Sequence, residues 1–116
     1  MKQLKKGSIV WIELGEPRIP GLIGKARPCV VFSNKSACKH SPVIQAIPLT
    51  TCDKSAHPIP IHLELNEIPG TLKKSTILCE QITTVPKSAI LGMPFHQLNE
   101  DEINLLNRAV AIQLAM

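Results

Sequence analysis

The sequence predicts a mainly β domain: a small curved antiparallel sheet or barrel with one C-terminal α-helix. Three observations predict this class. Short apolar and β-branched runs are separated by Gly- and Pro-rich segments, which is typical of strands and turns. The apolar spacing changes to a helical period after Asn99. The chain has 116 residues, of which 44% are hydrophobic, so a single domain over 1–116 is expected.

The first two strands are expected on either side of a long loop. Residues 8–14 are β-rich and are bounded by Gly7 and Gly15. The following stretch, 15–26, contains three Gly and two Pro, which deny it regular structure. Loops this long in small domains are often functional. Residues 27–33 form the second strand, and their continuous apolar run suggests burial on both faces.

The middle of the chain predicts further short strands joined by polar segments. Residues 34–42 are expected to be a polar connection, and residues 51–58 a turn-rich polar segment. Pro48 interrupts one strand near its end, and Pro60 makes another an edge strand or a bulge. The expected strands are 43–49, 59–65, 75–85 with a kink near Glu80, and 90–95.

The C-terminal helix has a clear start signal. Asn99 is a good N-cap, acidic residues fill the first turn, and Glu102 stands where a capping box needs it. The apolar residues that then recur at helical spacing are Ile103, Leu106, Val110 and Leu114.

Composition excludes several classes of protein. No apolar run reaches the roughly 20 residues of a membrane span, and the basic N-terminus lacks a signal-peptide core, so a cytoplasmic protein is expected. The four scattered cysteines are then expected to be free thiols. A net charge of +4 permits a polyanionic partner, but three aromatic residues argue against binding single strands by base stacking.

Standard catalytic motifs are absent from the sequence, and a metal site is not favoured. The best zinc candidates are Cys38, His40, Cys52 and His57, with His62 and Cys79 in reserve. Their spacing is looser than that of structural zinc sites, so neither a metal nor another cofactor is expected.

Arg27 is the more informative candidate. It lies where the long loop meets a buried strand, and Arg18 and Lys25 lie in the same loop. Thr50 and Thr51 end the third strand, and a guanidinium held near hydroxyls suits a phosphate. The alternative is an ordinary surface arginine at the start of a strand, with solvated hydroxyls in a turn.

Four segments in a fixed order resemble the MazF/PemK family of toxin endoribonucleases. They cover most of residues 7–115, and the combination of Arg-Pro, Pro-Leu-Thr and Glu-Gln-Ile is the most specific part. The segments are Gly-Ser-Ile-Val-Trp-Ile-Glu-Leu at 7–14, Lys-Ala-Arg-Pro-Cys-Val-Val-Phe-Ser-Asn at 25–34, Ile-Pro-Leu-Thr-Thr at 47–51 with Pro-Ile-His-Leu-Glu at 60–64, and Ser-Thr-Ile-Leu-Cys-Glu-Gln-Ile-Thr at 75–84.

This resemblance implies a fold, a reaction and partners. It implies an SH3-like small barrel with a terminal helix that forms a homodimer and cuts single-stranded RNA without a metal. The 2′-hydroxyl would attack the adjacent phosphorus, leaving 2′,3′-cyclic phosphate and 5′-hydroxyl ends. An antitoxin with an acidic, partly disordered tail would cover the RNA groove. By motif match Arg27 and Thr50 take the catalytic positions, and the RNA-binding positions are Lys25, Asn34, Thr51, His62 and Gln81.

The sequence also departs from the family pattern. Residues 21–24 lack the usual Glu-Gln pair of the first loop, and Thr83 replaces an Arg. A changed target sequence or an impaired activity would follow. The alternatives are a non-catalytic toxin of the related CcdB type, which blocks a topoisomerase, and an SH3-like binding module. The shortage of aromatic residues counts against a peptide-binding module.

Overall fold

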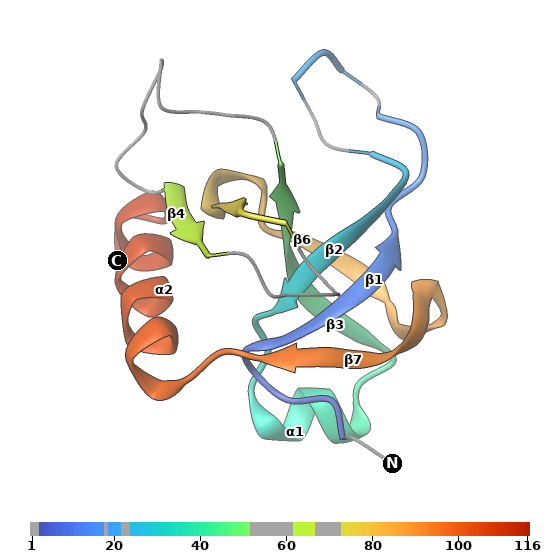
Figure 1. The fold of residues 1–116 in the computed structure, drawn as a ribbon. Helices are drawn as coiled ribbons and strands as arrows, with labels where there is room; N and C mark the ends of the chain where they lie inside the picture. Colours follow the sequence, from blue (N-terminus) through green and yellow to red (C-terminus); the bar gives the residue numbers. More distant parts are fainter. Residues whose placement is uncertain (1–2, 18, 22–23, 52–61, 67–72) are drawn as a thin grey trace.

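The computed structural model describes residues 3–17, 19–21, 24–51, 62–66 and 73–116. Two helices and seven strands are found in this part of the chain (Figure 1). The strands are β1 (Ser8–Glu13), β2 (Ala26–Val31), β3 (Val43–Thr50), β4 (His62–Leu65), β5 (Ser75–Leu78), β6 (Thr83–Pro86) and β7 (Ile90–Gln97). The helices are α1 (Lys35–His40) and α2 (Glu100–Gln113), and short 3₁₀ turns are η1 (Cys79–Gln81) and η2 (Lys87–Ala89).

The strands form one curved antiparallel sheet, which confirms the expected fold class. Its order is β4-β5-β3-β2-β1-β7, and β6 also pairs with β3. Strand β3 joins the two parts, since Val43–Ala46 pair with β6 whereas Leu49 and Thr50 pair with β5. The sheet bends where β3 changes partners, and this bend brings β5 and α2 over one face.

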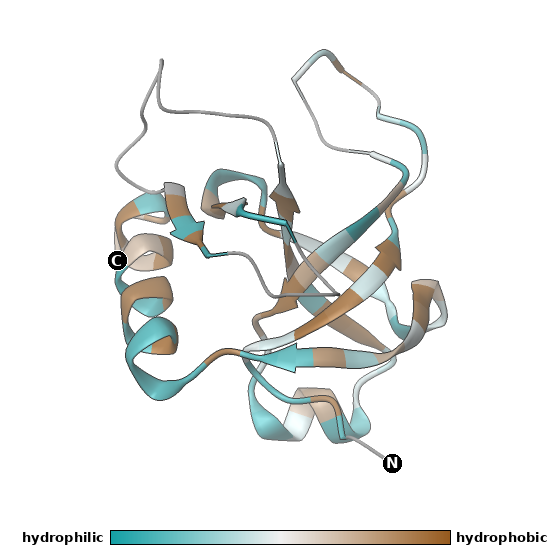
Figure 2. Ribbon diagram, in the orientation of Figure 1, coloured by the Kyte–Doolittle hydropathy of each residue, from teal (hydrophilic) through white to brown (hydrophobic). Residues whose placement is uncertain are grey.

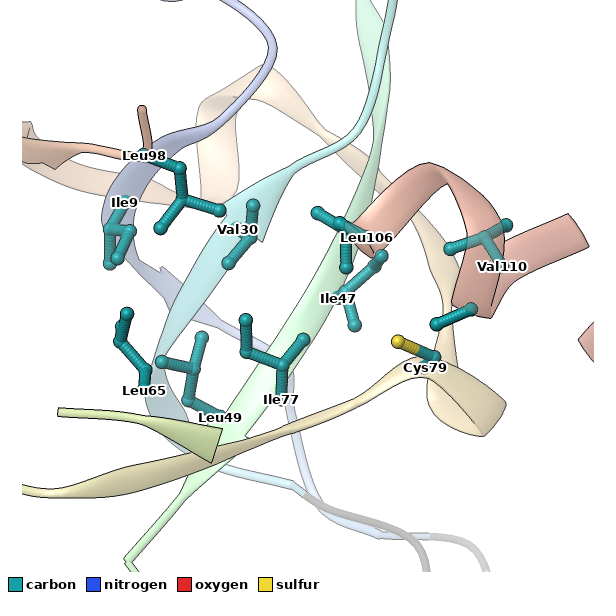
Figure 3. Packing of buried hydrophobic residues seen from close by; sticks show 11 residues of the cluster. Ile9, Val30, Ile47, Leu49, Leu65, Ile77, Cys79, Leu98, Leu106 and Val110 are labelled. Carbon is teal, nitrogen blue, oxygen red and sulfur yellow. The ribbon is translucent and has the colours of Figure 1, made fainter. Parts of the chain in front are cut away.

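Both faces of the central strands are buried, as the apolar run of β2 predicts. Side chains alternate between the faces of a strand, so neighbours on β2 enter different cores. Figure 2 shows hydrophobic residues along β1 and β3. Val30 belongs to a core covered by α2 (Figure 3), whereas Cys29 and Val31 belong to a second core that includes Cys38 of α1. The α2-side core includes Ile9, Val30, Ile47, Leu49, Ile77, Leu106 and Val110. The α1-side core includes Val10, Ile12, Cys29, Val31, Cys38, Ile44, Ala46 and Val85.

The C-terminal helix begins as predicted. The Asn99 side chain accepts a hydrogen bond from the Glu102 amide (2.8 Å), and the Glu102 carboxylate accepts one from the Asn99 amide (2.9 Å). Leu106 and Val110 are buried against the sheet. Leu114 differs from the expectation, because it is the C-cap residue of the helix and is half exposed.

Some local expectations differ from the structure. The connection at 34–42 contains α1, which Asn34 caps by accepting from the Ala37 amide (2.8 Å). The kink expected near Glu80 is confirmed as η1, but it separates two strands, β5 and β6, which pair with different parts of β3. Strand β3 continues past Pro48 to Thr50, one residue beyond the expected end, and β7 continues two residues further than expected, to Gln97. The expectations for 52–58 and for Pro60 lie outside the described residues.

The cysteines within the described residues are free thiols, as expected. Burial raises the pKa of Cys29 to about 12 and that of Cys79 to about 11. Two of the zinc candidates, Cys52 and His57, lie outside the described residues, and the Cys38 thiol donates to the Ser33 carbonyl (3.5 Å). Neither helix of the described chain has the length and apolar character needed to cross a bilayer.

Candidate functional site

The first element of the site is the end of β2 that carries Arg27. Arg27 pairs with Ile12 of β1 and lies on the same face as Cys29, two residues further along β2. That face holds the α1-side core, but the core ends near Arg27, and the arginine is only partly buried. The strand therefore places a charged side chain at the open end of an apolar layer.

Thr50 occupies the corresponding end of β3. It is the last residue of the strand, is buried, and pairs with Thr76 of β5. In the antiparallel pairing of β2 with β3, Cys29 lies opposite Pro48 and Val31 opposite Ala46. The pairing ends at Cys29 and Pro48; continued by two residues, the same register would bring Arg27 opposite Thr50 on the same face of the sheet. Residues in such a position have Cβ atoms about 4.5–5.5 Å apart.

The Arg27 guanidinium is anchored through one edge. Its Nε donates a hydrogen bond to the Gly24 carbonyl (3.2 Å), and its two Nη groups donate to no other described residue. A guanidinium held through Nε keeps a pair of parallel N–H donors, the geometry that binds a phosphate with two bonds. The anchor therefore orients Arg27 without using up its phosphate-binding edge.

The loop that supplies this anchor is closely packed at its base. A Cβ atom on Gly24 would lie 2.5 Å from Pro17 Cδ and 2.7 Å from the Gly15 carbonyl oxygen, so only glycine fits there. Leu14 donates its amide to the Lys25 carbonyl (2.9 Å), which closes the loop. Lys25 takes a positive φ of 64° and is exposed, so its ammonium adds a second cation to this edge.

A hollow of about 390 Å³ opens next to Pro48 of β3 and the loop that anchors Arg27. The described residues that line it come from the end of β1, the loop, β3, η1 and β6, and include Glu16, Pro17, Pro48, Gln81 and Thr83. Pro17 packs against Gly24, to which Arg27 is bonded, and Pro48 precedes Thr50 by two residues on the same face. The hollow therefore opens close to the two candidate catalytic residues, although neither is among its described lining residues.

Gln81 connects η1 to the loop. Its side-chain amide donates to the Gly21 carbonyl (3.0 Å), although the two residues are 60 positions apart in the chain. This contact and the Gly24 packing fix the loop at two points. Sequence reasoning found Gln81 but missed the role of Gly24, and the only signal in the sequence was the density of Gly and Pro in the loop.

The structure does not bring every candidate to this edge. Gln81 lines the hollow, and Lys25 and Arg27 lie at the base of the adjacent loop. Thr50, which exposed Thr51 follows, ends β3 two residues after Pro48 of the lining. Asn34 follows the opposite end of β2, where its side chain caps α1.

His62 begins β4, where its backbone pairs with Leu78, but its side chain lies outside the described residues. Arg18 lies outside them as well.

The assembled groups can stabilise negative charge on a phosphate. A fixed guanidinium and a threonine hydroxyl supply donors to non-bridging oxygens, which carry more charge in the transition state than in the ground state. Removing one donor of this kind costs roughly 2.7–4 kcal/mol of transition-state stabilisation.

A family model and a curated relative both relate this chain to the MazF-like toxins. The sequence profile of the family described as PemK-like, MazF-like toxin of type II toxin-antitoxin system matches residues 5–114. The endoribonuclease MazF of Staphylococcus saprophyticus is 32% identical over 94 residues, which cover 80% of this chain and 77% of that protein.

Solved structures share the fold. MazF of Deinococcus radiodurans superposes with a TM-score of 0.79 at 17% identity, over 100% of both chains. An endoribonuclease from a mycobacterial species, in complex with its cognate antitoxin, superposes with a TM-score of 0.75 at 20% identity, over 97% of this chain and 96% of that chain.

Proposed function

The chain belongs to the PemK-like, MazF-like toxins of type II toxin–antitoxin systems, and we propose that it is an endoribonuclease in which Arg27 and Thr50 act on one phosphodiester of single-stranded RNA. The observation that supports these roles most strongly is the β2–β3 register, in which Cys29 lies opposite Pro48; continued by two residues, it would bring Arg27 opposite Thr50. The anchored guanidinium and the adjacent hollow add a phosphate site and room for substrate.

The proposed reaction is an internal transfer at phosphorus. The ribose 2′-hydroxyl oxygen forms a bond to phosphorus, and the bond from phosphorus to the 5′-oxygen breaks. The products are a 2′,3′-cyclic phosphate and a 5′-hydroxyl end, to which a proton is delivered. Arg27 donates through its Nη groups to a non-bridging oxygen, and Thr50 donates through its hydroxyl, so both act most strongly as charge develops.

Proton transfer needs a further group. A guanidinium with a pKa above about 12 does not accept a proton at neutral pH. His62, on β4, is the histidine that the family motif brings to the groove, and it is our candidate for the base. A pH–rate profile of the His62→Gln variant tests this role, because loss of the base removes the limb that reports its titration.

The partners that we propose follow from charge and exposed apolar surface. A chain of net charge +4 suits an acidic antitoxin segment laid over Arg27 and Lys25. We place the homodimer contact on β1 and β7, where Trp11 and Leu91 pair across the strands and both, like Met93, are exposed. Light scattering of a Met93→Glu variant is expected to show a monomer. We also propose that this toxin acts in the cytoplasm.

The function is tested by incubating the purified protein with a long unstructured RNA in EDTA and mapping the cut ends. We expect cleavage at a restricted set of sequences, with cyclic phosphate on the 5′ fragment and hydroxyl on the 3′ fragment. Cleavage that disappears in EDTA and returns with zinc would contradict a reaction carried out by Arg27 and Thr50. An intact RNA together with inhibition of a topoisomerase would favour the CcdB type of toxin.

A further inference from the structure

Helix α1 carries a group of basic side chains at the end of the sheet away from Arg27. Figure 1 shows α1 at one end of the sheet and the loop between β1 and β2 at the other. The group, which we call the α1 patch, consists of Lys35, Lys39, His40 and Lys87. The three members on α1 are exposed, and Lys87 joins them because its Nζ donates a hydrogen bond to the Cys38 carbonyl (2.6 Å).

The α1 patch has no acidic counterpart in its own segments. The sequence contains no Asp or Glu between Glu16 and Asp53, and none between Glu80 and Glu100. Within the part of the chain that the structure describes, the lysines of the patch make no ion pair. Charges within about 8 Å of one another act together at physiological salt, so cations without counter-charges create a positive potential that attracts a polyanion.

The stability of α1 accounts for only part of this charge. Lys39 and His40 lie in the last turn, where the negative end of the helix dipole favours cations. Lys35 is the first residue of the helix, where the dipole favours an acid, and the first turn holds no acid. Because a lysine at this position lowers the stability of the helix, its charge is better explained by an anion outside the chain.

Strand β6 connects the α1 patch to the proposed cleavage site. Thr83, at the start of β6, lines the hollow next to the loop that anchors Arg27, and Lys87 directly follows the end of the strand. At about 3.3 Å per residue, β6 spans roughly 10 Å. Three of its four residues are exposed, so the path between the two regions is open to solvent.

We propose that the α1 patch is a second RNA site, which binds the phosphate backbone of the substrate strand at a distance from the cleaved bond. This inference rests on the proposed endoribonuclease function. RNA is favoured over an acidic protein because β6 leads from the patch to the proposed cleavage site, so one long strand reaches both. Contacts to phosphate carry no sequence information, so the patch adds affinity without a sequence preference. Two sites that engage one strand bind it more tightly than either site alone.

The test compares a long RNA with a short one that ends within a few nucleotides of the same cut site. The site variant, Lys35→Gln/Lys39→Gln, keeps Lys87, whose hydrogen bond holds the end of α1, and glutamine is a good helix former. The control variant, Lys73→Gln/Arg108→Gln, removes the same charge from exposed positions before β5 and on α2. KM and kcat are measured by cleavage. Affinity is measured by fluorescence anisotropy with a long 2′-O-methyl RNA, which lacks the attacking hydroxyl.

For the site variant, we expect KM for the long RNA to rise roughly tenfold with kcat unchanged, because two phosphate contacts are lost. KM for the short RNA is expected to stay at the wild-type value. Each lost contact to a single strand lowers the slope of log affinity against log salt by about 0.7, so this slope is expected to fall by about 1.4. Lys35→Glu is a second check, since an acid suits the first turn of α1 and the protein stays folded while its affinity for the long RNA falls.

The outcomes separate this inference from the function on which it rests. If the wild type binds the long 2′-O-methyl RNA through Lys35 and Lys39 but cuts no RNA, the proposed function fails and the α1 patch stands. If the wild type cuts RNA and the site variant has the same KM and salt slope, the patch is refuted and the endoribonuclease stands. Equal losses in the control variant, or an equal loss on the short RNA, also refute the second site. Unchanged RNA binding with weaker binding of poly-glutamate would assign the patch to an acidic protein instead.

Discussion

Replacing Gly24 by alanine perturbs the anchor of Arg27 without touching Arg27 itself. The added Cβ would lie 2.5 Å from Pro17 Cδ and 2.7 Å from the Gly15 oxygen, distances that side chains do not tolerate. Neither contact is with the end of a flexible side chain, so the loop must open. The Gly24 carbonyl, which accepts from Arg27 Nε at 3.2 Å, moves with it.

The expected loss of cleavage rate follows from the role of the Gly24 carbonyl, which positions the Arg27 guanidinium. Loss of a whole transition-state donor corresponds to about 10²–10³ in rate, and a displacement of about 1 Å costs up to about 10². We therefore expect Gly24→Ala to slow RNA cleavage by roughly 10–100-fold. Because the loop lies on the surface, it can relax around the added methyl group. We therefore expect the free energy of unfolding to fall by roughly 1 kcal/mol, the lower end of the range for overpacked sites.

The assay is single-turnover cleavage of a labelled RNA, combined with denaturant unfolding. Gly15→Ala is the matched control. It lies in the same loop at a positive φ of 77°, but an added Cβ meets nothing within 4 Å. The Gly15→Ala substitution costs about 1–2 kcal/mol of backbone strain but leaves Gly24 in place. Its cleavage rate is therefore expected to stay within a few-fold of the wild-type rate. A Gly24→Ala protein that is folded and as active as Gly15→Ala would refute the anchoring role.

Three other predictions concern charge geometry, helix stability and the buried thiols. Arg27→Lys keeps the charge but loses the two parallel donors, so its single-turnover rate is expected to fall at least 10²-fold, whereas a rate within threefold would show that charge alone suffices. Asn99→Ala removes one half of the capping box and is expected to lower the free energy of unfolding by about 1 kcal/mol, seen as a lower melting temperature with unchanged activity at 25 °C. Burial raises the pKa of Cys29 and Cys79 from 9.0 to about 12 and about 11, so above pH 9 the unfolded chain releases protons that the folded protein retains. The free energy of unfolding is therefore expected to fall between pH 9 and pH 11 in denaturant titrations, and to fall less steeply in a Cys29→Ala variant; equal slopes would contradict the assignment.

The parts of the fold that local signals specify could be predicted from the sequence. Gly7 and Gly15 mark β1, and the Asn99 cap with its helical spacing marks α2. Helix α1 was missed because six residues with one buried side chain, Cys38, show no apolar period. The kink near Glu80 was predicted, but the separation of β5 from β6 was not, because the segments on either side pair with different parts of β3, which is a tertiary effect.

The candidate site, too, could be predicted from the sequence only where local residues specify it. Arg27 and Thr50 could be selected from their chemistry and from the family motifs, and Gln81 from the motifs alone. The β2–β3 register, from which their alignment is inferred, depends on tertiary pairing that no local pattern encodes. The hollow depends on the packing of Gly24 against Pro17 and on the position of Thr83, which the sequence shows only as a departure from the family pattern.

The most direct measurement of the central claim is the single-turnover cleavage rate of Arg27→Ala, Thr50→Val and the double variant, on one RNA site cut by the wild type. Each single variant is expected to lose about 10²–10³ in rate while retaining a cooperative unfolding transition. The double variant is expected to lose less than the product of the two, because both donors act on one phosphate. A folded single variant that cleaves at the wild-type rate would contradict the account.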